Sequence, residues 1–451
     1  MNTSFFSELL QGIVERGRAL VARQRRTVPK LRSETLAEHC EALLSSRGEA
    51  TGTARASDIL NRYAELTTGP RIAFFELLAE RFGVNRARLD AAVAHWQANP
   101  GDAAAAEVHR AAEPRRQELL RRLNLAPGGT AALVRMREHL LEALERRPDL
   151  ASVDADFVHL FSSWFNRGFL VLRKIDWSTP AVILEKIIRY EAVHKINSWE
   201  DLRSRIDPPD RCCYAFFHPA LIDEPLIFVE VALTREIPAA IGPILAADRT
   251  PLDPEQATTA VFYSISNCQR GLAGVSFGHF LIKQVVEDIS REYANLSTFV
   301  TLSPVPDFAR WLDRERGTDS SRALSAADRA ALKVLDQPNW WRTTAARAVE
   351  GPLKRAAAWY FLHARNNRGR PLDPVARFHL GNGARLERIN FLADTSEKAL
   401  SQSYGLMVNY LYDLDAIEAN HEAYAEGRAI VAANAVKRLA PAPAANMVKT
   451  G

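Results

Sequence analysis

Hydrophobic and polar positions follow a helical period in the first third of the chain. Apolar side chains recur at three- and four-residue spacing, as in the stripe Phe74, Leu77, Leu78 and Phe82. Gly128-Gly129 turns the chain, and Thr130 is the expected N-cap of a helix with a second apolar stripe, formed by Leu133, Met136, Leu140, Leu141 and Leu144. We therefore expect an all-helical domain over residues 1–153.

The pattern changes after Asp154, where short β-branched and aromatic runs are bounded by turn residues. These runs predict strands at residues 213–217, 226–233, 258–266, 296–302, 384–391 and 405–412. The polar connection at 222–225 indicates that the first two strands form an antiparallel pair. Residues 154–451 are therefore predicted to form a mixed α/β domain.

Helical composition also returns within this second domain. We expect helices at 326–335, at 345–363 with an interruption or restart at Gly351-Pro352, and at 416–437. Together these runs predict a helical insertion over about 307–380, between the central strands and the last two strands.

Residues 258–304 combine a strand, a glycine-bearing turn, an amphipathic helix and another strand. The helix has Leu281, Ile282, Val285, Val286 and Ile289 on one face. A glycine turn at a helix N-terminus exposes unpaired N–H groups at the positive end of the helix dipole, where pyrophosphate binds well. A single such turn is more often just a tight turn, so the surrounding residues decide its meaning.

Composition and charge indicate which kinds of partner the protein is not expected to bind. Among the 451 residues, 25% are charged and 47% hydrophobic, and the net charge is +4. No basic run with interleaved aromatic residues occurs, and no apolar run approaches the roughly 20 residues of a membrane span. We expect neither nucleic acid nor membrane as a partner.

The four cysteines lack zinc-ligand spacing, and Cys212 and Cys213 are adjacent, which disfavours a disulfide between them. This favours a reducing compartment, and we expect a cytoplasmic protein. The arginine-bearing N-terminus superficially resembles a transit peptide, but Glu8 and Glu15 favour a first helix of the fold.

Seven ordered motifs in the last two-thirds of the chain resemble the malonyl-CoA decarboxylase family. They are WFNRGFL at 164–170, FYSIS at 262–266, GLAGV at 271–275, FLIK at 280–283, LSPVP at 302–306, FHLGNGA at 378–384 and GLMVNY at 405–410. The resemblance implies a helical N-terminal domain used for self-association, as a dimer or tetramer, followed by a catalytic domain of GNAT-like fold. It further implies a place in fatty acid metabolism and conversion of malonyl-CoA to acetyl-CoA and CO2. No metal or organic cofactor is implied, because coenzyme A enters as part of the substrate.

The resemblance places the catalytic serine at Ser303 and the catalytic histidine at His379. Considered alone, Ser303 before Pro304 is a common strand end, and His379 could equally be a turn or core residue. Residues implied to contact malonyl-CoA are Ser264, Gly271, Ala273, Gly274, Val275, Ser276, Phe277, Gly278, His279 and Tyr412. Animal members have an acidic residue at the position of Ser276, so its replacement leaves open which group orients His379. The side chain of His279 is expected on the helix surface.

The implied chemistry agrees with these residue types. Loss of CO2 leaves an enolate, which needs hydrogen-bond donors at its oxygen and a proton at its carbon. We expect His379 to donate that proton with an ordinary imidazole pKa of about 6.5, while Ser303 hydrogen-bonds or exchanges a proton beside it. Two alternatives remain: a CoA-dependent acyltransferase of the same fold, and a non-catalytic CoA-binding protein.

Overall fold

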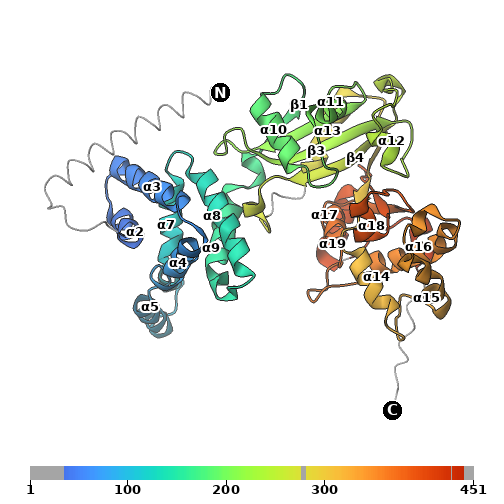
Figure 1. Cartoon of the computed structure of the whole chain (residues 1–451). Coiled ribbons are helices and arrows are strands. Elements are labelled where there is room, and N and C mark those ends of the chain that lie inside the picture. The colour runs from blue at the N-terminus through green and yellow to red at the C-terminus, as the bar shows by residue number, and fades with distance from the viewer. Residues whose placement is uncertain (1–34, 276–280, 428, 441–451) are drawn as a thin grey trace, which may run out of the picture. The chain divides into compact units, whose positions relative to one another are not determined.

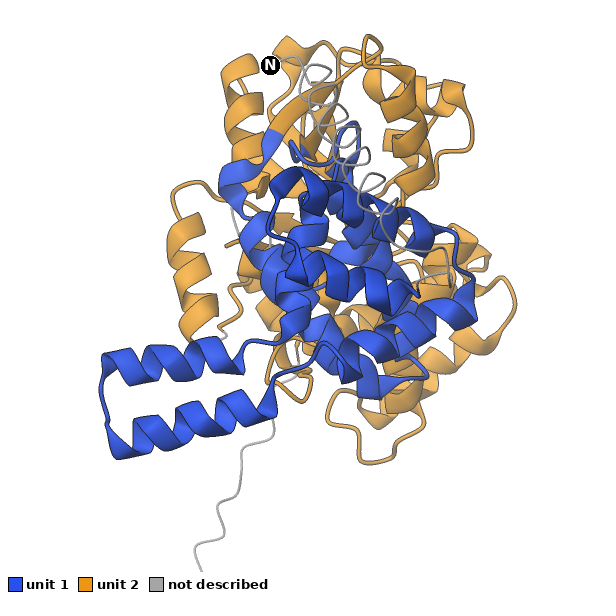
Figure 2. Ribbon diagram, turned by 90° about the vertical axis from the view of Figure 1, so that its left-hand side faces the viewer, with its two compact units in different colours: residues 1–171, 217–226, 269–278 blue, residues 172–216, 227–268, 279–451 orange. Residues whose placement is uncertain are grey.

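The computed structural model describes residues 35–275, 281–427 and 429–440. The chain divides into two compact units, which Figure 2 distinguishes by colour. The first comprises residues 1–171, 217–226 and 269–278, and the second comprises residues 172–216, 227–268 and 279–451. The domain division at residue 153 stays a prediction.

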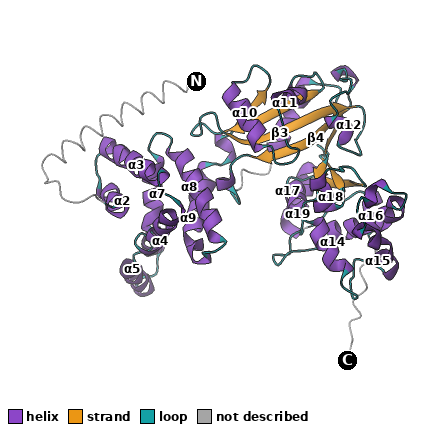
Figure 3. Cartoon of the chain, viewed as in Figure 1, coloured by secondary structure: helices purple, strands orange, loops and turns teal. Residues whose placement is uncertain are grey.

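Helices account for most of the first unit, as Figure 3 shows in purple. The capping box of Thr35 with Glu38 starts the first described helix. Phe75, Leu123 and Leu140 are among the fully buried side chains at the centre of this unit. The helices are α2 (Leu36–Ser45), α3 (Glu49–Ala64), α4 (Thr68–Glu80), α5 (Arg86–Ala98), α6 (Asp102–Ala112), α7 (Arg115–Asn124), α8 (Gly129–Leu144) and α9 (Ala151–Trp164), with short 3-10 turns η1 (Pro148–Leu150) and η2 (Arg167–Phe169).

The start of α8 differs from its expected form. The N-cap is Gly128, with φ of +69°, and the helix begins at Gly129, so Thr130 already lies inside it. The left-handed conformation at Gly128 favours glycine. The Thr130 hydroxyl instead donates to the Asn124 side chain at 2.8 Å.

The glycine turn after β4 packs tightly against α8. This turn contains η4 (Arg270–Leu272), and Arg137 of α8 donates to the carbonyl oxygen of Gly271 at 2.8 Å. A Cβ on Gly271 would lie 1.9 Å from the carbonyl oxygen of Val134, so only glycine fits there. Helix packing therefore explains Gly271 without any ligand.

The second unit is built on an eight-stranded mixed sheet (Figure 1). Its order is β1-β2-β3-β4-β5-β8-β6, with β7 pairing with β8. All six predicted strands are present, and β1 and the short β6 are additional. The strands are β1 (Val171–Ile175), β2 (Arg211–Phe217), β3 (Pro225–Thr234), β4 (Thr259–Asn267), β5 (Thr298–Thr301), β6 (Ser303–Pro304), β7 (Arg385–Asn390) and β8 (Met407–Leu411).

Helices fill the connections between these strands. The predicted apolar face of α13 is buried from Leu281 to Ile289. The helices are α10 (Ala181–Tyr190), α11 (Trp199–Ile206), α12 (Gly242–Leu245), α13 (Leu281–Glu292), α14 (Phe308–Arg316), α15 (Ala326–Leu332), α16 (Ala346–His363), α17 (Pro374–Gly381), α18 (Glu397–Ser403), α19 (Ile417–Gly427) and α20 (Asn434–Leu439); the 3-10 turns are η3 (Pro254–Gln256), η5 (Lys333–Asp336) and η6 (Trp340–Arg342).

The helical N-terminal region followed by a mixed α/β unit with inserted helices confirms the predicted fold class. Besides the N-cap of α8, two further local predictions were wrong. Helix α16 runs through Pro352, because the buried neighbours Val349, Leu353 and Ala356 hold it together across one missing backbone hydrogen bond. The helix expected at 416–437 is divided, because Leu386 of β7 accepts from the Ala433 N–H and donates to the Val431 oxygen.

Two further properties concern the whole described chain. Among its helices, none is long and apolar enough to span a lipid bilayer. Cys40, Cys212, Cys213 and Cys268 are all buried free thiols. Burial raises the pKa of Cys212 to about 11 and that of Cys40 to about 12, so these two thiols stay protonated at neutral pH.

The contact between the glycine turn and α8 gives a stability prediction. Gly271→Ala should destabilise the protein by roughly 1–3 kcal/mol or more, because the added Cβ overlaps backbone atoms. Gly52→Ala within α3 is the control, since its Cβ meets nothing within 4 Å and should stabilise the protein by about 0.5–1 kcal/mol. Thermal unfolding followed by circular dichroism measures both variants. Equal melting temperatures for Gly271→Ala and the wild type would contradict the close packing.

Candidate active site

The site begins where two parallel strands of the second unit separate. Strands β4 and β5 pair in parallel from Thr259 to Phe262. The pairing of β4 with β3 shifts register here, with Val231 opposite Phe262 and Glu230 opposite Ser264, so Tyr263 is the extra residue of a β-bulge. Beyond Phe262, β4 continues beside β3. The segment that follows β5 turns away from β4, and its Ser303 pairs with Val408 of β8.

A cavity of about 250 Å³ lies at this separation, within the second unit. One side is formed by β4 and the opposite side by residues 302–304, while α17 and Val193 complete it. Most of the lining is apolar, with polar groups at a few positions, as is typical of small-molecule sites. The lining residues are Val193, Phe262, Tyr263, Ile265, Asn267, Leu302, Ser303, Pro304, Pro374, Val375, Phe378 and His379.

Ser303 and His379, which are 76 residues apart in the sequence, meet in this cavity. The Ser303 Oγ lies 3.1 Å from His379 Nε2, and the other ring nitrogen, Nδ1, lies 2.8 Å from the Tyr412 hydroxyl. The Ser303 hydroxyl also lies 2.8 Å from Thr301 Oγ1. The result is a continuous hydrogen-bonded chain of Thr301, Ser303, His379 and Tyr412.

The backbone and a neighbouring ring hold His379 in place. It lies in the last turn of α17, a helix that starts with Pro374 at its first position and with the Asp373 carboxylate accepting from the Ala376 N–H at 2.7 Å. Its ring stacks on Tyr410, with centroids 4.6 Å apart and an interplanar angle of 25°. Stacking on one face and hydrogen bonds at both nitrogens leave the imidazole one orientation.

The charge state of His379 differs from expectation. The side chain is 3% exposed, and its removal from water lowers the pKa of the imidazole to about 3. The expected value of about 6.5 is therefore wrong for the folded protein. Burial also raises the pKa of Tyr412. At neutral pH this hydrogen-bonded row of side chains therefore contains a neutral imidazole and a protonated phenol.

The structure does not bring Ser264 or Tyr412 to the cavity surface. The hydroxyl of Ser264 is buried and donates to the Glu191 carboxylate, at 2.9 and 2.8 Å from its two oxygens. Tyr412 lies behind His379. A substrate contact for either residue stays a prediction, with a positional role visible for Tyr412.

The structure describes only some of the residues predicted to contact malonyl-CoA at the glycine turn. Gly274 has a φ of +78°, and a Cβ there would meet no atom of the described residues within 4 Å. Ala273 is exposed and Val275 is buried. Ser276, Phe277, Gly278 and His279 lie outside the described residues. The pyrophosphate site therefore stays a prediction.

Sequence reasoning missed three residues of the site. Thr301 and Tyr410 each precede a predicted residue by two positions, and alternation along a strand could have identified them as neighbours on the same face. Asp373 precedes a proline at the start of a helix, which is an N-cap signal. Among the described residues, no group of three or more histidine, cysteine, aspartate or glutamate side chains is arranged to hold a metal ion.

Comparison with known proteins agrees with the motifs. The family model described as "Malonyl-CoA decarboxylase C-terminal domain" matches residues 168–450, and the model of the "Malonyl-CoA decarboxylase N-terminal domain" matches residues 82–165. A mitochondrial malonyl-CoA decarboxylase of Anser anser anser is 35% identical over 408 residues, covering 82% of this chain and 80% of that protein. The enzyme of the same name from Rattus norvegicus is 34% identical over 431 residues, covering 88% and 87%.

Solved structures show the same relationship. The crystal structure of malonyl-CoA decarboxylase from Rhodopseudomonas palustris is 60% identical, covers 89% of this chain and 98% of its own, and superposes with a TM-score of 0.87. The structure from Agrobacterium vitis is 58% identical, covers 90% and 99%, and has a TM-score of 0.86. Both the family model and these relatives span most of the chain. The protein therefore belongs to the malonyl-CoA decarboxylase family.

Proposed function

We propose that the protein converts malonyl-CoA to acetyl-CoA and CO2. The observation that supports this most directly is the placement of His379 between Ser303 and Tyr412, at a cavity formed by two separating strands. Membership of the family supports the same reaction. Self-association through the N-terminal helices, as a dimer or tetramer, stays a prediction, as do cytoplasmic location, a role in fatty acid metabolism and independence of any cofactor.

The cavity suits the acyl end of a coenzyme A thioester. Apolar side chains such as Ile265, Leu302 and Phe378 fit an aliphatic chain, and the Ser303 hydroxyl offers a hydrogen bond to the malonyl group. In the proposed reaction, the bond between the carboxylate carbon and the methylene carbon breaks. CO2 leaves, and the bonding electron pair becomes the enolate of acetyl-CoA.

A neutral His379 changes how the enolate receives its proton. With the proton on Nε2, the imidazole accepts from the Tyr412 hydroxyl at Nδ1 and donates from Nε2. The enolate carbon is basic enough to take the Nε2 proton, directly or through the Ser303 hydroxyl, while Tyr412 passes its proton to Nδ1. A proton taken up from water at Nε2, with return of the Nδ1 proton to Tyr412, then restores both groups. One malonyl-CoA and one proton thus yield one acetyl-CoA and one CO2.

The first test is turnover without an acceptor. Purified protein incubated with malonyl-CoA alone should release CO2 and acetyl-CoA in equal amounts. In deuterated water, the acetyl methyl group should contain one solvent-derived deuterium. Consumption of acetyl-CoA only when an amine or carrier-protein acceptor is added would instead indicate an acyltransferase. Binding of CoA without any turnover would indicate a non-catalytic protein.

Ser303→Ala should lose turnover while keeping most of its affinity for CoA, because the hydroxyl serves the acyl group. Removing a group that acts in the transition state lowers kcat and kcat/KM together. Calorimetric titration with CoA gives the affinity, and acetyl-CoA formation gives the rate. Ser403→Ala is the matched control, because Ser403 is a buried serine of α18 whose hydroxyl bonds only to backbone carbonyls among the described residues. Equal losses of affinity and rate in Ser303→Ala would indicate a packing role.

His379→Asn should reduce the rate by roughly 100- to 10,000-fold, the usual contribution of general acid catalysis. Because the wild-type imidazole is neutral, the reduction should be the same at each pH between 5 and 8, with no limb near pH 6.5 that disappears in the variant. His363→Asn on α16 controls for loss of a histidine elsewhere. Near-normal turnover by His379→Asn would remove His379 from the mechanism.

The same variant tests the charge state independently of activity. The unfolded imidazole binds a proton below about pH 6.5, whereas the folded one does so only below about 3. Between these values the unfolded state binds more protons, so His379 contributes stability above pH 6.5 that is lost as the pH falls. The melting temperature of His379→Asn should therefore decline less steeply than that of the wild type between pH 6.5 and 4.

A further inference from the structure

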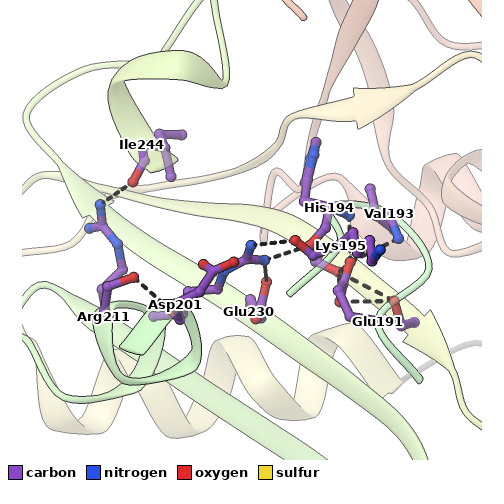
Figure 4. Close-up of polar contacts among 12 residues, drawn as sticks. Glu191, Val193, His194, Lys195, Asp201, Arg211, Glu230 and Ile244 are labelled. Carbon is purple, nitrogen blue, oxygen red and sulfur yellow. Dashed lines mark hydrogen bonds and ion pairs between the residues drawn. The ribbon is translucent and has the colours of Figure 1, made fainter. Parts of the chain in front are cut away.

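One wall of the cavity is a loop held by buried polar groups. This loop, residues 191–195, follows α10, and its Val193 lines the cavity. Figure 4 shows Glu191 and the groups around this loop. Three sets of contacts hold its backbone, centred on Glu191, on Arg205 and on Lys398.

The Glu191 carboxylate joins the loop to β4. Its Oε1 accepts from the backbone N–H groups of Val193 at 2.8 Å and His194 at 2.6 Å. Both oxygens accept from the Ser264 hydroxyl, and Oε2 also accepts from Ser266 at 3.2 Å. Glu191 is 8% exposed, so these bonds form away from water and fix the loop against the strand that lines the same cavity.

Arg205 holds the following residues of the loop. Its guanidinium donates to the carbonyl oxygens of His194 at 2.7 Å and Lys195 at 3.1 Å. The same group lies 3.4 Å from the Glu230 carboxylate and 3.0 Å from that of Asp201. Lys398 Nζ donates to the carbonyl oxygens of Ala192 and, at 3.1 Å, of Val193. The carbonyl groups of the loop are thus held by Arg205 and Lys398, and the N–H groups of Val193 and His194 by Glu191.

We infer that Glu191 is a positioning residue of the substrate cavity: it holds Val193 in the wall by joining the loop to Ser264 and Ser266. This rests on the proposed function, because it concerns the cavity proposed to hold the acyl end of the substrate. It also gives Ser264 a role without substrate contact. Ser264 acts through Glu191, on the side of β4 that the cavity does not use.

Two substitutions at Glu191 distinguish a role in positioning the loop from a role that needs the negative charge of the carboxylate. A glutamine at position 191 keeps one carbonyl oxygen for the Val193 and His194 N–H groups. Its amide N–H groups reach the Ser264 and Ser266 hydroxyls, which accept hydrogen bonds as well as donate them. Glu191→Gln therefore keeps the connection, whereas Glu191→Ala removes it. A group that needs its negative charge, for example as a base, fails in both variants.

The test compares these variants in KM, kcat and affinity for CoA. Glu191→Ala should raise KM for malonyl-CoA and the Kd for CoA by about tenfold or more, with kcat changed less than about threefold. Glu191→Gln should stay within about threefold of the wild type in all three quantities. Equal losses in Glu191→Gln and Glu191→Ala, or a loss confined to kcat, would overturn the positioning role.

A double-mutant cycle tests the connection to β4. If Ser264 and Ser266 act through Glu191, the triple variant Glu191→Ala, Ser264→Ala, Ser266→Ala should have nearly the KM of Glu191→Ala alone. Additive effects would mean that the serines contact the substrate directly and would overturn the inference. The cycle also needs the variant Ser264→Ala, Ser266→Ala, which keeps Glu191 and so keeps the test informative if Glu191→Ala fails to fold: it should raise KM with kcat changed less than about threefold.

The control separates general destabilisation from positioning. Asp328→Ala removes another buried carboxylate of the second unit, one that caps α15 and pairs with Arg355. It should lower the melting temperature and leave KM unchanged. A rise in KM for Asp328→Ala as large as that for Glu191→Ala would attribute the effect to stability.

The proposed function and the inference can fail separately. Wild-type protein that neither binds CoA nor turns over malonyl-CoA would overturn the proposed function itself. A functional wild type together with a Glu191→Ala variant of unchanged KM and affinity for CoA would overturn only the inference.

Discussion

The candidate site depends on the separation of two parallel strands beyond Phe262. Strand β4 stays paired with β3, and the chain after Leu302 pairs with β8, so both chains keep a hydrogen-bonded neighbour on the side away from the opening. The bulge at Tyr263 lies directly after Phe262, the last residue of β4 that pairs with β5. A sheet that remained paired along its whole length would have no space for a ligand between these strands.

This opening places His379 in a site that excludes water. Burial lowers the pKa of the imidazole to about 3, while Ser303 and Tyr412 occupy its two nitrogens. A neutral imidazole is a weak acid, yet it suits an enolate, which is a strong base. The same burial that prevents His379 from carrying a charge also strengthens each hydrogen bond in the chain, because the local dielectric constant is low.

A second set of polar contacts near the cavity holds one of its walls in place. Glu191 and Arg205 satisfy the N–H and carbonyl groups of a loop that lacks regular secondary structure, and so fix one wall. Their positions explain why Ser264 is a hydroxyl on a buried strand, since a buried carboxylate needs donors around it. Ser264 on β4 and Ser303 on β6 are thus two buried serines of one sheet with different partners.

Local pattern in the sequence determined the helical N-terminal region, α13, six of the eight strands and the motifs around Ser303 and His379, because periodicity and turn chemistry are properties of short segments. It did not indicate α10, α11 or α18. It could also have indicated Thr301 and Tyr410 through strand alternation. The continuity of α16 through Pro352 and the division of the last predicted helix were decided by packing and by pairing with Leu386. Only the tertiary structure decided the depressed pKa of His379 and the partnership of Glu191 with Ser264. Both depend on burial and on contacts between residues more than 70 positions apart, which no local pattern encodes.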